Sequence, residues 1–202
     1  MKHKFLILIA PLILGSCDVI PSIKKSFVKR ETIHDSHGES VLVKPMSAWD
    51  KRSLNGIKFF ESFKRKRYTC PGGVGTIGYG CTKKYVVNKR TISREDAAFY
   101  LQKDYDEYAA HVDRIVTVPL SPYQRAALIS FTYNCGPGAL TTLVTGPDRL
   151  NSGNYKSVET ILPQYRKGGG KVLKGLVKRR AWELTIWRAI KPIKIEEFSN
   201  DK

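Results

Sequence analysis

After Glu61 the sequence contains no further acid until Glu95, and the residues around this glutamate favour acid–base chemistry. Three aromatic residues, Phe59, Phe60 and Phe63, flank it in the sequence. Partial desolvation by such rings favours the protonated form of a carboxyl group, which a general acid at neutral pH requires. A glutamate at a helix end is more often a solvated surface residue, so this context alone leaves both interpretations open.

The stretch "YTCPGGVGTIGYGCT", residues 68–82, predicts a glycine-rich β-hairpin soon after the glutamate. Pro71 followed by two glycines favours a turn, and Val74, Thr76 and Ile77 favour a strand. The glycines at 78 and 80 remove side chains from one strand face, which lets another group approach the backbone closely.

Five segments carry helical patterns, and they set the expected architecture. A first helix is predicted over 53–65, with Ser53 as its cap and the basic residues 64–67 at its end, where cations suit the helix dipole. A long helix is predicted from Ser93 to Val116. "SPYQ" at 121–124 opens the next helix, which "NCGPGA" ends. "VETILPQY" predicts a short helix, and "GLVKRRAWELTIWRAI" a final amphipathic one. These elements predict an α+β fold: a small β-hairpin lobe joined by a long helix to a mainly helical lobe, with a cleft suited to a polymeric substrate.

The N-terminal segment "MKHKFLILIAPLILGSC" has the features of an export signal. Lys2 and Lys4 precede an apolar run from Phe5 to Leu14, which is too short for a bilayer of about 30 Å and fits a secretory signal. The last four residues, "LGSC", resemble a bacterial lipobox, in which Cys17 would become lipidated. An uncleaved, releasable membrane anchor and a buried N-terminal element are the alternatives. We expect an exported protein, either a periplasm-facing, membrane-anchored lipoprotein or a secreted one.

These features divide the chain into four parts: a signal segment (1–17), a tether (18–48), one folded domain (49–192) and a tail (193–202). The 202 residues suit a single domain, and the hydrophobic content of 42% is enough for a packed core. The tether is expected to space the domain from the membrane.

The net charge of +17 favours an anionic partner. Loss of residues 1–16, which hold two lysines and no acid, would lower it only to +15. No zinc-finger spacing or RNP-like aromatic motif accompanies the basic clusters, so nucleic acid is disfavoured. An anionic membrane or cell-wall surface is the favoured partner. We expect no cofactor, no metal site and a monomer.

The segment "FFESFKRKRYTCPGGVGTIGYGCT" resembles the active-site region of the phage-type (T4-like) lysozymes, glycoside hydrolase family 24. In that family a helix ends in Glu-Gly, and an aromatic residue, then Asp or Cys, precedes "PxGVxTIGYGHT". "FTYNCGPGAL", "RLNSGNY" and "GLVKRRAWEL" resemble later family segments in the same order. The resemblance covers about residues 50–190 and implies a lysozyme-like fold.

The resemblance also implies roles for individual residues. Glu61 would be the general acid that protonates the leaving glycosidic oxygen, and Thr76 would help to hold the attacking water. Cys70 stands where many members have the catalytic Asp. The implied reaction is hydrolysis of the β-1,4 bond between N-acetylmuramic acid and N-acetylglucosamine in peptidoglycan, with inversion in the Asp-bearing enzymes. Tyr79, Asn134 and Arg179 are candidates for substrate binding or support by position.

A thiol at the position of the Asp changes the expected chemistry. A cysteine is mostly neutral at neutral pH unless nearby cations favour the thiolate, and the basic residues 64–67 could do so. We expect the Cys70 thiolate to act as base or charge stabiliser. A covalent glycosyl-thioether route and a purely space-filling role stay open.

Two other positions depart from the family pattern. Ser62 replaces the usual Gly after the glutamate, and Cys81 replaces the usual His in "GYGHT", which is expected to affect stability more than chemistry. If Cys17 is lipidated, the remaining cysteines could pair as Cys70–Cys81 or as Cys81–Cys135. Only a reduced Cys70 fits the catalytic role, so a disulfide there would make a latent enzyme that thiol exchange activates.

Three functions remain open from the sequence. The leading one is an exported muramidase. A lytic transglycosylase or chitinase-like enzyme is the near alternative, although the retained Thr76 argues against a transglycosylase. A degenerate homologue that binds peptidoglycan without cutting it would also fit the two exchanges to cysteine.

Overall fold

The computed structural model describes residues 31–43, 45–70 and 73–189. The predicted signal segment and tail lie outside these ranges. The elements in chain order are β1 (Glu31–His34), β2 (Ser40–Val43), α1 (Ala48–Glu61), β3 (Lys64–Thr69), β4 (Gly75–Gly78), α2 (Lys84–Val87), α3 (Arg94–Ile115), α4 (Pro122–Val144), η1 (Leu150–Ser152), α5 (Lys156–Ile161), η2 (Leu162–Gln164), β5 (Lys167–Gly168), β6 (Lys171–Val172) and α6 (Lys174–Trp187).

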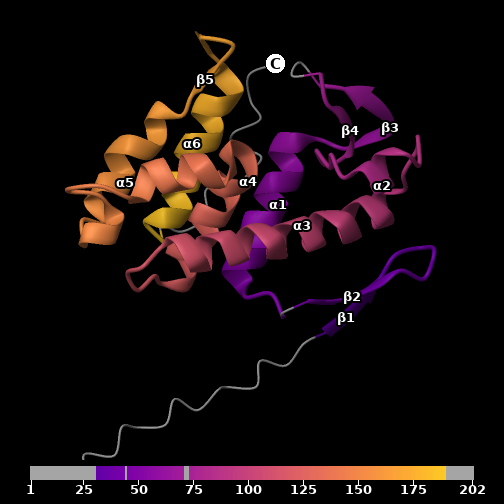
Figure 1. Ribbon diagram of the computed structural model, residues 1–202, viewed down its shortest axis with the longest axis horizontal. Coiled ribbons are helices and arrows are strands. Elements are labelled where there is room, and N and C mark those ends of the chain that lie inside the picture. The colour runs from indigo at the N-terminus through magenta and orange to yellow at the C-terminus, as the bar shows by residue number, and fades with distance from the viewer. Residues whose placement is uncertain (1–30, 44, 71–72, 190–202) are drawn as a thin grey trace, which may run out of the picture.

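The long helix α3 joins two lobes (Figure 1). One lobe holds β3, β4 and α2, and the other holds α4, α5 and α6. Each lobe has its own core, and α3 contributes to both: Ala97 and Tyr100 pack in the small lobe, while Tyr105 and Val112 pack in the helical lobe. The predicted α+β architecture with two lobes is therefore confirmed.

Local capping explains where the principal helices begin. Ser93 accepts a hydrogen bond from the Asp96 backbone, and Ser121 forms a capping box with Gln124, as the sequence predicts. The first helix differs from expectation, because a capping box of Ser47 and Asp50 starts it one and a half turns earlier.

Three segments depart from the predicted elements. Residues 31–43, expected within the tether, form the hairpin β1–β2, whose Ser36 backbone and hydroxyl both donate to Asp96 of α3 at 2.8 Å. Residues 64–67, expected at a helix end, form most of β3. The α4 helix does not end at "NCGPGA" but kinks there, at Gly136 (φ 82°), and continues to Val144.

Ser62 ends α1 in a strained backbone conformation, with φ 57° and ψ 151°. This region of backbone space is nearly exclusive to glycine, the residue that the family has here, and costs a side chain on the order of 1–3 kcal/mol. Because glycine also gains entropy in the unfolded chain, we expect Ser62→Gly to raise the free energy of unfolding by a net of about 1 kcal/mol. Urea denaturation measures the gain. Ser62→Ala keeps the strain and is the control, so an equal gain in both variants would contradict this account.

Within the ranges that the structure describes, no helix is both long and apolar enough to cross a membrane. The predicted signal or anchor segment, residues 1–17, is outside those ranges, so its cleavage or its use as a membrane anchor stays a prediction.

Candidate active site

Glu61 is the last residue of α1, and its carboxylate reaches both lobes. Its Oε1 lies 2.5 Å from Nη1 of Arg179 in α6, which belongs to the helical lobe. Its Oε2 lies against Gly80 of the small lobe, where a Cβ would be only 3.2 Å away. The side chain is 23% exposed. The carboxylate is thus fixed in place yet open to solvent.

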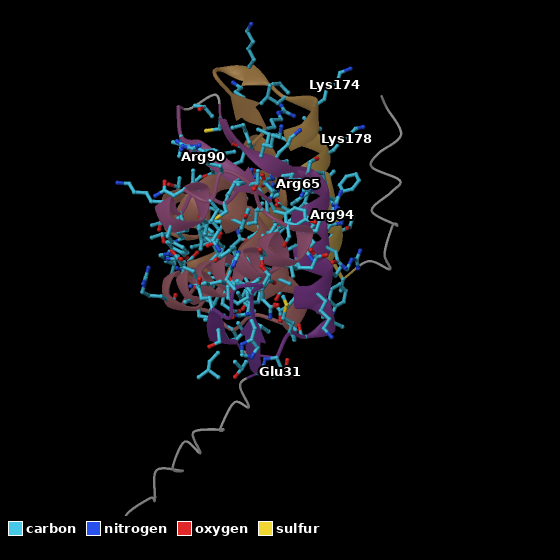
Figure 2. All side chains as sticks on the ribbon, turned by 90° about the vertical axis from the view of Figure 1, so that its right-hand side faces the viewer. Glu31, Arg65, Arg90, Arg94, Lys174 and Lys178 are labelled. Atoms are coloured by element: carbon cyan, nitrogen blue, oxygen red, sulfur yellow. The ribbon has the colours of Figure 1, made fainter. Side chains whose placement is uncertain are left out.

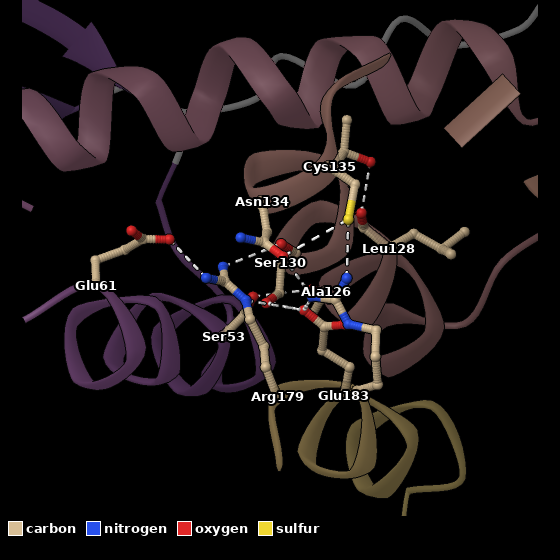
Figure 3. A network of polar contacts seen from close by, with 11 residues as sticks. Ser53, Glu61, Ala126, Leu128, Ser130, Asn134, Cys135, Arg179 and Glu183 are labelled. Carbon is tan, nitrogen blue, oxygen red and sulfur yellow. Dashed lines mark hydrogen bonds and ion pairs between the residues drawn. The ribbon is translucent and has the colours of Figure 1, made fainter. Parts of the chain in front are cut away.

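Arg179 is part of a buried ionic network behind Glu61 (Figure 3). Its side chain is 3% exposed, and its Nε lies 3.3 Å from Oε1 of Glu183, one helical turn further on. Glu183 is fully buried and also accepts hydrogen bonds from Ser130 at 2.8 Å and from Arg180 at 2.9 Å. The Nε of Arg180 also lies 2.8 Å from Oε2 of Glu183, so the network balances the two carboxylates of Glu61 and Glu183 with two guanidinium groups.

The stretch of hairpin beside the glutamate is held from the helical lobe. The hydroxyl of Tyr133 in α4 donates to the backbone carbonyl of Tyr79 at 2.7 Å. Gly80 follows with φ 89°, a conformation that side chains rarely adopt, and its bare backbone faces Glu61. The Tyr79 ring packs on Phe63 at a centroid distance of 5.6 Å. Tyr79 therefore supports the hairpin through both its ring and its carbonyl.

Thr76 lies in β4, and Cys70 directly follows Thr69, the last residue of β3. Thr76 pairs with Tyr68 in the register and is 4% exposed, and its hydroxyl donates to the Val74 carbonyl at 3.1 Å. The Cys70 backbone N–H donates to the same carbonyl at 2.9 Å. Burial raises the pKa of Tyr68, and its electrostatic interactions with Glu61 and Cys70 raise it further. Tyr68 therefore interacts electrostatically with both predicted catalytic groups.

The Asn134 side chain is anchored to the buried ionic network. Its Oδ1 accepts a hydrogen bond from Arg180 at 3.0 Å, and Arg180 also approaches the Cys135 sulfur at 2.9 Å. Burial raises the pKa of the Cys135 thiol, while the positive charge of Arg180 opposes the rise. Asn134 thus lies two residues before the kink of α4 at Gly136.

No disulfide joins the three described cysteines, Cys70, Cys81 and Cys135. Neither pairing considered from the sequence is therefore formed in this structure. Cys81 is 5% exposed, in the core of the small lobe, and faces Asp104 of α3. Burial, with the charge of Asp104, raises the pKa of Cys81 to about 11. Cys81 is thus a buried, protonated core residue at neutral pH.

Asp104 titrates in an unusual range, and this predicts a pH dependence of stability. Burial raises its pKa from 3.8 to about 6. Between these values the folded protein keeps a proton that the unfolded chain loses, so stability should fall as pH rises from about 4 to 6, by about 3 kcal/mol. Asp104→Asn should lack this loss. Denaturation of both proteins at several pH values measures the difference, and curves that run parallel would contradict it.

The sequence did not predict three residues of the site: Ser130, Tyr133 and Glu183. The spacing of Arg179 and Glu183 on one helix face was a usable signal for their ion pair. Nothing local signals the Tyr133–Tyr79 bond, because its partners lie far apart in the sequence.

Among the described residues, no group of three or more His, Cys, Asp or Glu side chains could hold a metal ion.

Two solved structures share this architecture. The endolysin from Escherichia coli O157:H7 phage FAHEc1 superposes with a TM-score of 0.59 at 28% identity, covering 74% of this chain and 99% of that one. The muramidase domain of SpmX from Asticaccaulis excentricus gives a TM-score of 0.60 at 28% identity, covering 70% and 97%. The fold is therefore lysozyme-like.

Comparison of the sequence with known families assigns the chain to one family within this fold class. The profile of the phage lysozyme family matches residues 58–183, which include Glu61, the hairpin and Arg179. The chain belongs to the phage lysozyme family. The endolysin of Bacillus phage B103 is 38% identical over 138 residues, which are 66% of this chain and 51% of that protein. The chain spans about half the length of the curated Bacillus phage endolysins that it matches.

Proposed function

We propose that the chain is a lysozyme-type peptidoglycan hydrolase, an N-acetylmuramidase that cleaves the β-1,4 bond between N-acetylmuramic acid and N-acetylglucosamine. One observation carries the proposal. Glu61 ends a helix in the segment that matches the phage lysozyme family, with one oxygen bound to Arg179 and the other against Gly80. Membership of that family and the fold shared with a muramidase domain support the class of reaction.

In this proposal Glu61 is the general acid. Arg179 occupies Oε1, so Oε2 is the oxygen that would carry the proton to the leaving glycosidic oxygen. Arg179, itself held by Glu183, orients the carboxylate of Glu61. Tyr79 and Asn134 would act as support residues of the hairpin and of the α4 kink. The acid thus has a fixed geometry and one available oxygen.

The residues proposed to hold and activate the attacking water belong to the β3–β4 hairpin region. Thr76 would hold the attacking water through its hydroxyl, and Cys70 would serve as base or charge stabiliser in place of the family's Asp. This assignment is supported by their place in one hairpin, where the Thr76 hydroxyl and the Cys70 N–H both donate to the Val74 carbonyl. The water would attack opposite the leaving group.

The setting of the reaction follows from the N-terminal segment and the charge. We propose that the protein is exported, with Cys17 as the lipid attachment site, and that it acts on peptidoglycan as a monomer. The net charge of +17 supports attraction to an anionic membrane or wall surface.

Mass spectrometry of muropeptides released from purified sacculi tests the function. Fragments that end in reducing N-acetylmuramic acid are the expected product. Anhydro-sugars would identify a lytic transglycosylase instead, and the absence of products from a folded, reduced protein would favour the binding-only homologue that the two cysteine exchanges suggested.

A further inference from the structure

The strand β3 carries four consecutive exposed cations, Lys64 to Arg67. This strand is hydrogen-bonded along both edges. On one edge it pairs with β4, and on the other it meets residues 90–92. There the Arg67 backbone N–H donates to the Arg90 carbonyl, and the Ile92 N–H donates to the Arg65 carbonyl, each at 2.9 Å.

This second pairing brings two basic segments of the small lobe together, and their exposed cations make a strongly positive region around β3. We call it the basic surface, and it consists of Lys64, Arg65, Lys66, Arg67, Lys89, Arg90 and Arg94. The two segments that form it, residues 64–70 and 88–94, contain no acid. Figure 2 shows Arg65, Arg90 and Arg94 on the outside of the molecule. The fold therefore gathers cations that the sequence places about 25 residues apart.

Part of this charge has no acidic partner among the described residues. Lys89 lies 3.5 Å from Asp35, and Arg94 stacks over the Phe63 ring at 4.5 Å. Arg65, Lys66 and Arg90 make no ion pair with any acid in the described ranges. Like charges held this close repel one another, so an anion bound across them would be stabilised.

A cavity of about 610 Å³ opens beside the basic surface. Arg65 and Lys89 line it, together with the hydroxyl residues Thr91 and Ser93 and with His37. Its carboxylate, Asp96, already accepts two hydrogen bonds from Ser36 of the N-terminal hairpin. A guanidinium, an ammonium and hydroxyl donors around one cavity match the chemistry of a phosphate group.

We propose that the basic surface binds a phosphodiester polymer attached to the bacterial wall and so holds the enzyme on its substrate. This proposal rests on the proposed function. Alternate cations along a strand lie about 6.6 Å apart, which suits a linear polymer with repeating charge. Glu31, the first described residue, is at one end of the molecule, and Arg90 lies toward the other (Figure 2).

Binding of the full chain to purified sacculi tests the proposal. All proteins carry Glu61→Gln, so that failure of hydrolysis cannot affect the result. The triple variant Arg65→Gln, Lys66→Gln, Arg90→Gln is compared with a control of equal charge loss, Lys51→Gln, Lys156→Gln, Lys171→Gln, whose lysines are exposed on other elements. We expect about tenfold weaker binding for the first and less than about threefold for the control.

A second arm identifies the ligand. Sacculi treated with hydrofluoric acid lose their phosphodiester polymers, and the parent protein should bind them no better than the triple variant does. Raised salt should weaken binding of the parent to native sacculi. Equal binding by the triple variant and its control, or unchanged binding to the stripped sacculi, would overturn the proposal. It would equally be overturned if the basic surface mattered only for phosphatidylglycerol vesicles, since the ligand would then be a membrane.

Discussion

Glu61→Gln should lower the rate of peptidoglycan hydrolysis by about 10²–10⁴-fold, the range that a general acid contributes. Glutamine keeps the size of the side chain and can still place its amide oxygen toward Arg179, but it has no proton to give to the leaving oxygen. The geometry of the site therefore survives while the acid is lost. The rate of muropeptide release from sacculi measures the effect.

Two comparisons separate a chemical loss from a structural one. Glu95→Gln removes an exposed carboxylate at the start of α3 and should keep the parent rate. Thermal unfolding of Glu61→Gln should show a folded protein, with a modest change because the ion pair with buried Arg179 is weakened. A Glu61→Gln variant that retains activity would refute the assignment of the acid.

Cys70→Ser should lower the hydrolysis rate by about 10²-fold or more, and Cys70→Asp should restore much of it. Serine is nearly the size of cysteine but stays neutral, so it can neither accept a proton from water nor stabilise a developing cation. Aspartate is ionised at neutral pH and supplies both functions. Rates measured on sacculi under reducing conditions compare the three proteins.

The neighbouring position provides the control for this series. Thr69→Ala changes the exposed last residue of β3, next to Cys70, and should leave the rate unchanged. A Cys70→Ser enzyme with parental activity would mean that the thiol only fills space. If reducing agent leaves the activity of the parent protein unchanged, the latent-disulfide hypothesis fails, in agreement with the unpaired state of Cys81 and Cys135 in this structure.

The elements that the sequence predicts well are those specified by local signals. Ser121, Pro122 and Gln124 define the start of α4 within four residues, and the helix begins there. Ser53 looked like a similar cap, but it is buried inside α1 and its hydroxyl donates to the Ala126 carbonyl of α4. A serine can serve either purpose, and only tertiary packing decides between them.

The candidate site likewise combines residues whose proximity the sequence predicts with residues that only the fold brings together. Glu61 and the hairpin lie within one continuous motif, so their proximity follows from the sequence. The ion pair of Glu61 with Arg179 joins residues 118 positions apart, and the position of Arg179 alone suggested either substrate binding or support. Residues 64–67 were expected to end a helix, because their charge suits the helix dipole. The strained turn at Ser62 instead redirects the chain, and pairing with β4 and residues 90–92 makes them a strand.

Digestion of sacculi in water labelled with heavy oxygen tests the central claim most directly. If Glu61 protonates the leaving oxygen while a water held by the hairpin attacks, each new reducing N-acetylmuramic acid end must carry one labelled oxygen. Mass spectrometry of the released muropeptides should therefore find the label at every new end, and far fewer new ends with Glu61→Gln. Products that form without the label would contradict hydrolysis by this site.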